Sequence, residues 1–253
     1  IDAARVQQDR RSRIPRLWQV DEATVAAAEA AYDIKVPPDD DPASVPELAL
    51  APETQLPQGY EVVKLYTDFY TGFSALVLQS TPALRLPRHR IYAIAGTHVF
   101  DNTDLRTWAS GLTMGTAQIT ASAALVMLQD AAAFAADMAG GGEVFVTGQS
   151  QGGLTAQGLG YLLETYLSAT APWHHLTHVV AWGGVGATEA LAAMIRRERE
   201  GEARGIWQAL ETHFAAIDPH NAPAAQVWAV LAAEWAKIPP GEEAAHIALI
   251  SRQ

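Results

Sequence analysis

The most constraining stretch of the chain is EVFVTGQSQGGLTAQGLGYLL, residues 143–163. It begins with an apolar run of the kind found in buried strands, which leads up to Gly148. Ser150 follows two residues later, and two further glycines, Gly152 and Gly153, open a helix-like stretch over 152–167. Glycine tolerates both positive φ and close backbone approach, so this spacing predicts a tight strand-to-helix turn with a serine at its sharpest point.

This turn fits the G-x-S-x-G pattern of a nucleophile elbow, with Gly148 and Gly152 on either side of Ser150. A serine hydroxyl is a weak nucleophile and must be accessible to a base and to substrate. The turn lifts the serine above the sheet, and the helix that follows directs backbone N–H groups at the reacting carbonyl. The plain alternative is a glycine-rich turn with a surface serine. A phosphate-binding loop is disfavoured because the stretch has neither G-x-x-x-x-G-K-[ST] nor G-x-G-x-x-G.

Predicted strands and helices alternate around this turn. A β-hairpin is expected over 60–80, and buried strands are expected over 89–100 and 176–184. This alternation favours an α/β fold of the α/β-hydrolase type, with a mostly parallel central sheet flanked by helices, an antiparallel lead-in hairpin and helical cap or lid insertions. Further helices are expected within residues 1–34 and over 117–138, 187–214 and 223–237, and a short strand over 213–218.

The domain organisation follows from composition along the chain. Residues 1–58 are expected to form an N-terminal arm, a helix and a Pro/Asp-rich connection, because 36–58 is dense in proline and aspartate. Residues 59–253 are expected to form the catalytic domain, with a helical insertion at about 187–214. A length of 253 residues with 49% hydrophobic residues suits one large α/β domain.

Few residues can complete a catalytic triad in the order serine, acid, histidine. After Ser150 the chain contains one aspartate, Asp218, and two histidines come after it. His220 shares a turn with Asp218, so the interpretation assigns His246 as general base and Asp218 as the residue that orients it. Glu189, just after the 176–184 strand, is the alternative acid. A turn-forming role for Asp218 and a helix-flanking role for His246 remain open.

An oxyanion hole needs two donors near the serine. One is expected to be the N–H of Gln151, and the other to come from Thr97, which follows Gly96 at the end of the 89–100 strand. Ordinary loop and packing roles remain open for the candidate substrate-facing residues, which are His98, Trp108 and Gln149.

Two of these stretches together resemble a known family. IYAIAGTHVFDNTDLRTWASGL, residues 91–112, followed by VFVTGQSQGGLTAQ, residues 144–157, is similar to the class 3 (fungal-type) lipases. The resemblance covers roughly residues 60–185 and implies hydrolysis of lipid or other esters, Thr97 in the oxyanion hole and a mobile lid after it. Ala95, Gln149 and Gln151 depart from that family's pattern, which suggests a divergent, bacterial member.

Composition excludes several other classes of function. The net charge of −11 argues against nucleic acid as a partner, and the absence of cysteine excludes disulfides and thiolate metal sites. We expect no metal and no cofactor. The sequence shows neither a membrane-spanning run nor a signal peptide, and it starts at Ile1, which indicates a trimmed or processed chain. Compartment and oligomeric state stay open, with secretion from a bacterium as one option.

The sequence therefore predicts a serine esterase or lipase that forms an acyl-enzyme at Ser150. The expected partner is a small-molecule or lipid ester, with transient contact to a lipid interface. Two alternatives remain: an acyltransferase with the same triad, and a catalytically silent hydrolase-fold binding module.

Overall fold

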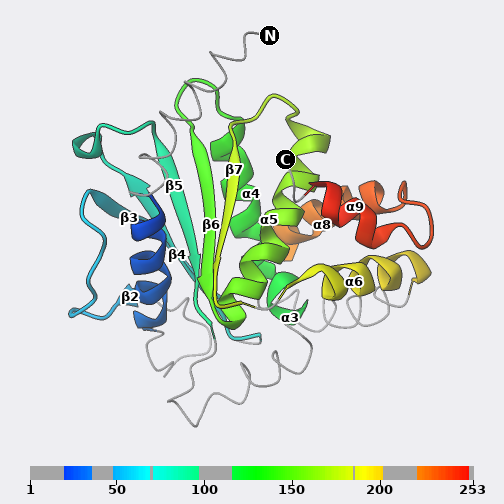
Figure 1. Cartoon of the computed structure of the whole chain (residues 1–253), viewed down its shortest axis with the longest axis horizontal. Helices are drawn as coiled ribbons and strands as arrows, with labels where there is room; N and C mark the ends of the chain where they lie inside the picture. The colour runs from blue at the N-terminus through cyan, green and yellow to red at the C-terminus, as the bar shows by residue number, and fades with distance from the viewer. Residues whose placement is uncertain are drawn as a thin grey trace.

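The computed structural model describes residues 20–35, 48–68, 71–96, 116–184, 186–201 and 221–250. Its centre is a five-stranded sheet in the order β3-β4-β5-β6-β7 (Figure 1). The β3–β4 and β4–β5 pairs are antiparallel, and the β5–β6 and β6–β7 pairs are parallel. The strands are β3 (Tyr60–Asp68), β4 (Phe73–Ser80), β5 (His89–Ile94), β6 (Glu143–Gln149) and β7 (Thr177–Trp182).

The α/β architecture and the lead-in hairpin are confirmed. Tyr60 pairs with Ser80 and Asp68 with Phe73, around a turn in which Gly72 has φ +68°. The prediction of a mostly parallel sheet is wrong for the described strands of the central sheet, since two of the four pairings in that sheet are antiparallel. The hairpin is not an appendage before the sheet: β4 hydrogen-bonds directly to β5, and so the hairpin forms the antiparallel half of the sheet.

Helices cover both faces of the sheet (Figure 1). One face packs on α4 (Ser122–Ala136) and α5 (Gln151–Thr170), with α8 (Asn221–Trp235) and α9 (Glu243–Ile250) beyond them. The opposite face packs on the helix over residues 20–30. Strand β5 shows the alternation: Ile91 belongs to the core on the 20–30 side, and Tyr92 belongs to the core on the α4 side. Burial on both faces explains why this strand reads as one apolar run.

Two predicted helices are shorter in the structure. The single helix expected over 117–138 is two, α3 (Thr116–Ile119) and α4, because Ala121 adopts an extended ψ of 139°. The helix expected from residue 187 is α6 (Thr188–Glu200), which ends at Gly201 with φ +76°. The Gly201 N–H donates to the last carbonyls of the helix, as in a glycine C-cap. Residues 202–214 of the expected helix lie outside the described residues, and so does the strand expected over 213–218.

The N-terminal segment is part of the main fold. Ala27 and Ala31 are fully buried against the sheet, within the same core as Leu76 of β4 and Phe145 of β6. A small second sheet, β1 (Ile34–Lys35) with β2 (Ala49–Leu50), continues from this segment. Residues 20–35 thus contribute to the core that supports the site. None of the helices within the described ranges has the length and hydrophobicity needed to cross a lipid bilayer.

Candidate functional site

The three parallel strands end together at one edge of the sheet. Ile94 of β5 pairs with Gly148 of β6, and Gln149 pairs with Trp182 of β7. In open α/β sheets, ligands bind outside the carboxyl ends of the strands. Ser150 follows β6 directly at this edge and is exposed. The serine singled out by its sequence pattern therefore lies where such folds hold their substrates.

The backbone of Ser150 is strained. Its φ is +55° and its ψ is −121°, and among the described residues only Arg85 is another non-glycine residue with positive φ. A non-glycine residue in such a conformation costs about 1–3 kcal/mol and persists only where its surroundings hold it. Here the Ser150 N–H donates to the Trp182 carbonyl (2.9 Å), and the Ser150 carbonyl accepts from Gly153 N–H (3.0 Å). The strained strand-to-helix turn predicted from the sequence is confirmed.

Glycines make this turn sterically feasible. A Cβ on Gly148 would overlap the Gly152 carbonyl, and a Cβ on Gly152 would overlap the Ile94 carbonyl. On the other side, a Cβ on Gly184 would lie 2.9 Å from the carbonyl carbon of Gly153. The first turn of α5 therefore sits against the ends of β5, β6 and the segment after β7 at a distance that only glycine allows.

Replacement of Gly152 by alanine tests this packing. We expect Gly152→Ala to lower the free energy of unfolding by about 2–3 kcal/mol, because its Cβ would meet backbone atoms that cannot rotate away. Urea denaturation would measure the loss. Gly186→Ala is the matched control, since its Cβ would meet nothing within 4 Å and its φ is not positive. Equal stability of the two variants would contradict the close approach of α5.

A buried polar network supports the first turn of α5 from beneath. The Thr155 hydroxyl lies 3.1 Å from the Gln151 carbonyl and 3.1 Å from the side-chain oxygen of Gln118. The Gln118 amide nitrogen donates to the Gly72 carbonyl (3.3 Å) in the β3–β4 turn. Both Thr155 and Gln118 are fully buried. The network fixes Gln151, the residue expected to direct its N–H at an oxyanion, relative to the hairpin.

Tyr32 also reaches this edge, and the sequence reading did not identify it. Its phenol oxygen lies 3.4 Å from the Gln149 carbonyl, although the two residues are 117 positions apart. A Cβ on Gly96 would overlap this phenol and would lie 2.6 Å from the same carbonyl. Gly96, Gln149 and Tyr32 therefore converge beside Ser150. No local sequence pattern around Tyr32 indicates this contact, because it arises from the docking of helix 20–30.

The structure does not bring His246 to Ser150. His246 lies on α9, where its Nδ1 is 3.2 Å from the Tyr161 hydroxyl and its ring meets the Tyr161 ring edge-on (centroids 6.1 Å apart). Tyr161 is eleven residues beyond Ser150 along α5, which at 1.5 Å per residue is roughly 16 Å. Burial lowers the pKa of His246, so its ring is neutral at pH 7. In this arrangement it is a packing residue between α9 and α5.

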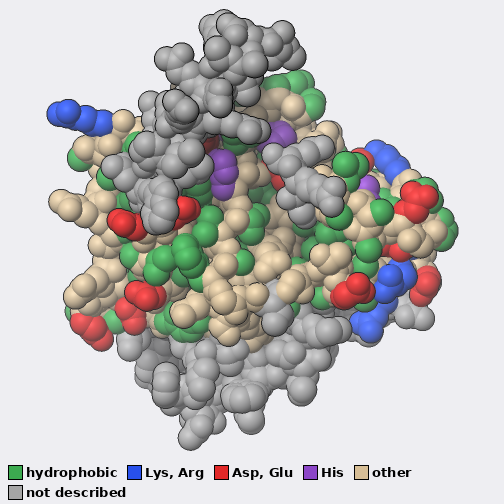
Figure 2. Space-filling model, in the orientation of Figure 1, with side chains coloured by type: hydrophobic (Ala, Val, Ile, Leu, Met, Phe, Trp, Pro, Cys, Tyr) green, Lys and Arg blue, Asp and Glu red, His purple; other side chains and the backbone are tan. Residues whose placement is uncertain are grey.

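Four further histidines lie at the opposite edge, near the amino ends of β5 and β7. Figure 2 shows histidine side chains near the upper end of the visible face. Their side chains make different contacts. The His178 ring stacks on Phe145 (centroids 4.5 Å apart), and the His174 Nε2 lies 3.3 Å from a Glu164 carboxylate oxygen. The remaining two are His89, at the start of β5, and His175, whose backbone N–H donates to the Ala135 carbonyl.

Asp218, Thr97, His98 and Trp108 lie outside the described residues. Glu189 is exposed in the first turn of α6, and no described histidine is paired with it. Gln149 is exposed beside Ser150, and Gln151 begins α5 and is half-buried.

His89 makes fold stability depend on pH. Its Nδ1 lies 2.8 Å from the Pro87 carbonyl, and its Nε2 lies 2.7 Å from the Tyr60 hydroxyl, so the neutral ring satisfies both partners. Burial lowers the pKa of His89 below the ordinary 6.5, which means that the unfolded chain takes up the proton first. Stability should therefore fall as the pH drops below about 6.5.

His89→Gln should reduce this acid dependence without abolishing it, because His246 also has a lowered pKa. Thermal unfolding midpoints of wild type and variant between about pH 5 and 8 would measure the difference. Parallel curves for the two proteins would rule out His89 as a source of the dependence.

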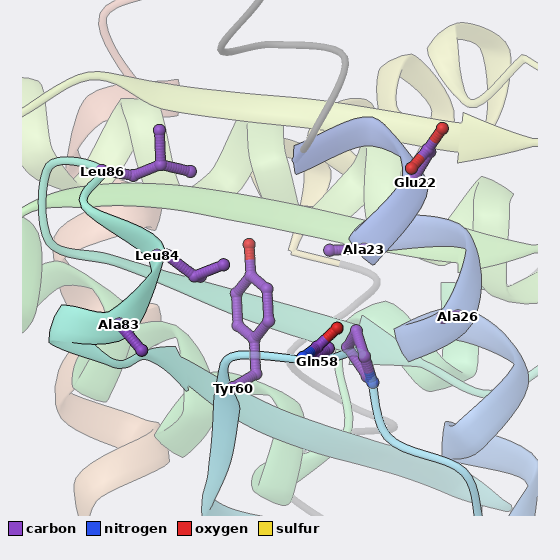
Figure 3. Close-up of a pocket in the computed structure, with 9 residues that line it drawn as sticks. Glu22, Ala23, Ala26, Gln58, Tyr60, Ala83, Leu84 and Leu86 are labelled. Carbon is purple, nitrogen blue, oxygen red and sulfur yellow. The ribbon is translucent and has the colours of Figure 1, made fainter.

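A separate cavity lies far from Ser150. It has a volume of about 470 Å³ and is open to solvent. Figure 3 shows it between helix 20–30, which contributes Glu22 and Ala26, and the start of β3, from which the Tyr60 ring projects into it. Because Tyr60 contacts His89 at the amino end of β5, this cavity belongs to the edge opposite the candidate site.

Within the described ranges, no three histidine, aspartate or glutamate side chains are grouped so that they could hold a metal ion. A comparison of the chain with models of known protein families found no match, and a comparison with curated proteins found no significant similarity. The geometry of the Ser150 turn is therefore the feature from which a function can be inferred.

Proposed function

We propose that this chain is a serine hydrolase of the α/β-hydrolase type that cleaves carboxylic esters, with lipid acyl esters as its substrate class. One observation carries the proposal: Ser150 has φ +55° and ψ −121° in a glycine-lined turn between a parallel strand and a helix. Strained backbone of this kind concentrates at functional sites. If Ser150 were only a surface residue, the strain would serve no purpose, because a glycine at this position would adopt the same backbone conformation without it.

The proposed reaction has two stages. The Ser150 oxygen attacks the ester carbonyl carbon while a base removes its proton, and the carbonyl oxygen becomes an oxyanion. The Gln151 N–H at the start of α5, with Thr97 as second donor, would stabilise that charge. The tetrahedral intermediate collapses, the alcohol leaves with the proton from the base, and an acyl-enzyme remains. Water, deprotonated by the same base, then releases the acid and restores the Ser150 hydroxyl.

The base is proposed from the histidines outside the described residues. The chain has eight histidines, and the five described ones lie away from Ser150: His89, His174, His175, His178 and His246. His98, His213 and His220 remain; of these, only His220 follows Asp218 and keeps the order serine, acid, histidine, although it shares a turn with that aspartate. His98 follows the end of β5 in sequence, whereas His213 and His220 flank Asp218, which stays the proposed acid. This proposal replaces His246 as base.

The test uses the full chain, a fluorophosphonate probe and p-nitrophenyl esters of increasing acyl length. Covalent labelling at Ser150, together with ester hydrolysis, would support the proposal. A preference for long acyl chains would support lipid esters over short ones. Absence of both labelling and hydrolysis would overturn the serine hydrolase proposal.

A second candidate is a catalytically silent binding module of the same fold. The observation that favours it is the contact between His246 and Tyr161, which removes the only histidine that the sequence reading assigned as base. The same probe separates the two candidates, because fluorophosphonates react with a serine that has been activated by a base.

A further inference from the structure

Tyr32 belongs to a segment that packs on the far face of the sheet. It lies in η1 (Ala31–Asp33), the 3₁₀ turn that ends helix 20–30. Ala31, the residue before it, is fully buried, and Ile34, two residues after it, is buried in the same core. The backbone on both sides of Tyr32 is thus anchored, and the phenol extends from a rigid base to the edge where β5 and β6 end.

The phenol bridges two backbone segments that the proposed reaction uses. The Tyr32 hydroxyl donates to the Gln149 carbonyl (3.4 Å), one residue before the nucleophile. The same phenol oxygen lies against the Gly96 backbone, one residue before the proposed oxyanion donor Thr97. Gly96 has no space for a side chain, since a Cβ there would overlap the phenol. One side chain therefore joins the end of β5 to the end of β6.

The phenol keeps its proton under ordinary conditions. Burial raises the pKa of Tyr32 above its usual value of 10.0, so at neutral pH the hydroxyl carries the proton that it donates to the Gln149 carbonyl. A phenylalanine at this position would fill nearly the same volume but could not donate to the Gln149 carbonyl. The hydroxyl can thus be removed without changing the packing of the ring.

We propose that Tyr32 is a positioning residue, whose hydroxyl sets the gap between the end of β5 and the nucleophile turn. This inference rests on the proposed function, because the gap matters only if Ser150 attacks a carbonyl whose oxyanion is held from the β5 side. Acyl transfer is sensitive to such spacing: a shift of about 1 Å in a reacting group can cost 10²-fold in rate. The N-terminal helix, which the sequence placed before the catalytic domain, would then be part of the catalytic apparatus.

The test compares Tyr32→Phe with a matched control, Tyr60→Phe. Both tyrosines are partly buried and hydrogen-bonded through their hydroxyls, but Tyr60 bonds His89 at the opposite edge of the sheet. We expect Tyr32→Phe to lower kcat and the rate of fluorophosphonate labelling about tenfold, with little change in KM. Tyr60→Phe should leave both rates at the wild-type level. Tyr60→Phe should unfold at the lower temperature, because it leaves the buried His89 Nε2 without its partner, so a loss of rate confined to Tyr32→Phe cannot come from lost stability.

Three other outcomes would overturn the positioning role of Tyr32, and they can be told apart. If wild type is labelled and Tyr32→Phe reacts at the same rate, the positioning role is wrong and the proposed function stands. Equal losses in both tyrosine variants would indicate general loosening of the fold instead. If wild type itself is neither labelled nor active, the proposed function fails, and the role of Tyr32 fails with it.

Discussion

Replacing Ser150 with alanine should abolish ester hydrolysis, with a fall in kcat on the order of 10⁴-fold or more. The reason is chemical, because the Ser150 oxygen forms the covalent bond to the acyl group in the proposed reaction. Labelling by a fluorophosphonate should disappear as well. Hydrolysis of a p-nitrophenyl ester and mass spectrometry of the labelled chain would measure the two effects. Activity in Ser150→Ala near the wild-type level would show that hydrolysis occurs elsewhere.

Ser150→Gly is the matched variant for this prediction. Alanine keeps the Cβ and therefore the strain at φ +55°, whereas glycine relieves it. Relief of about 1–3 kcal/mol outweighs or matches the cost of about 1 kcal/mol from the extra freedom of glycine in the unfolded chain. Ser150→Gly should thus be inactive but unfold at a temperature at least as high as Ser150→Ala. A clearly less stable glycine variant would contradict the strained turn.

The sequence was sufficient to predict this turn because the determinants are local. Gly148 and Gly152 are close to Ser150 in the chain, and each is required by a contact within the turn or with the adjacent strand end. The apolar run before them and the helix after them also follow from patterns of a few residues. The hairpin over 60–80 was predictable for the same reason, whereas its integration into the main sheet was not.

The rest of the site depends on contacts between distant segments. Tyr32 and Gln149 are 117 residues apart, and only the docking of helix 20–30 on the sheet brings them together. His246 was assigned from chain order alone, and chain order does not indicate where α9 packs. Glu243 at the start of α9 is buried and lies 2.6 Å from Arg199 of α6, which holds the C-terminal helix against α6. Chain order can select candidate residues, but it contains no information on such packing.

The histidine base is the second prediction with a large expected effect. Single glutamine substitutions at His98, His213, His220 and His246 would identify it. Exactly one of the first three should lower kcat on the order of 10⁴-fold, because without a base the Ser150 proton has no acceptor. His246→Gln should retain activity within a few-fold, since its ring contacts Tyr161 and not the serine. In wild type, kcat should rise with pH through the pKa of the base.

The opposite result would also be informative about the fold. If His246→Gln alone abolishes activity, α9 must reach Ser150 through a rearrangement that breaks the hydrogen bond between His246 and Tyr161. Tyr161→Phe would then release His246 and raise activity. If His246 is a packing residue, the same substitution only removes a partly buried hydrogen bond, which contributes about 1 kcal/mol to stability, and it leaves kcat unchanged. A rise in kcat in Tyr161→Phe would therefore indicate that α9 takes part in catalysis, and an unchanged kcat would indicate that α9 only packs on α5.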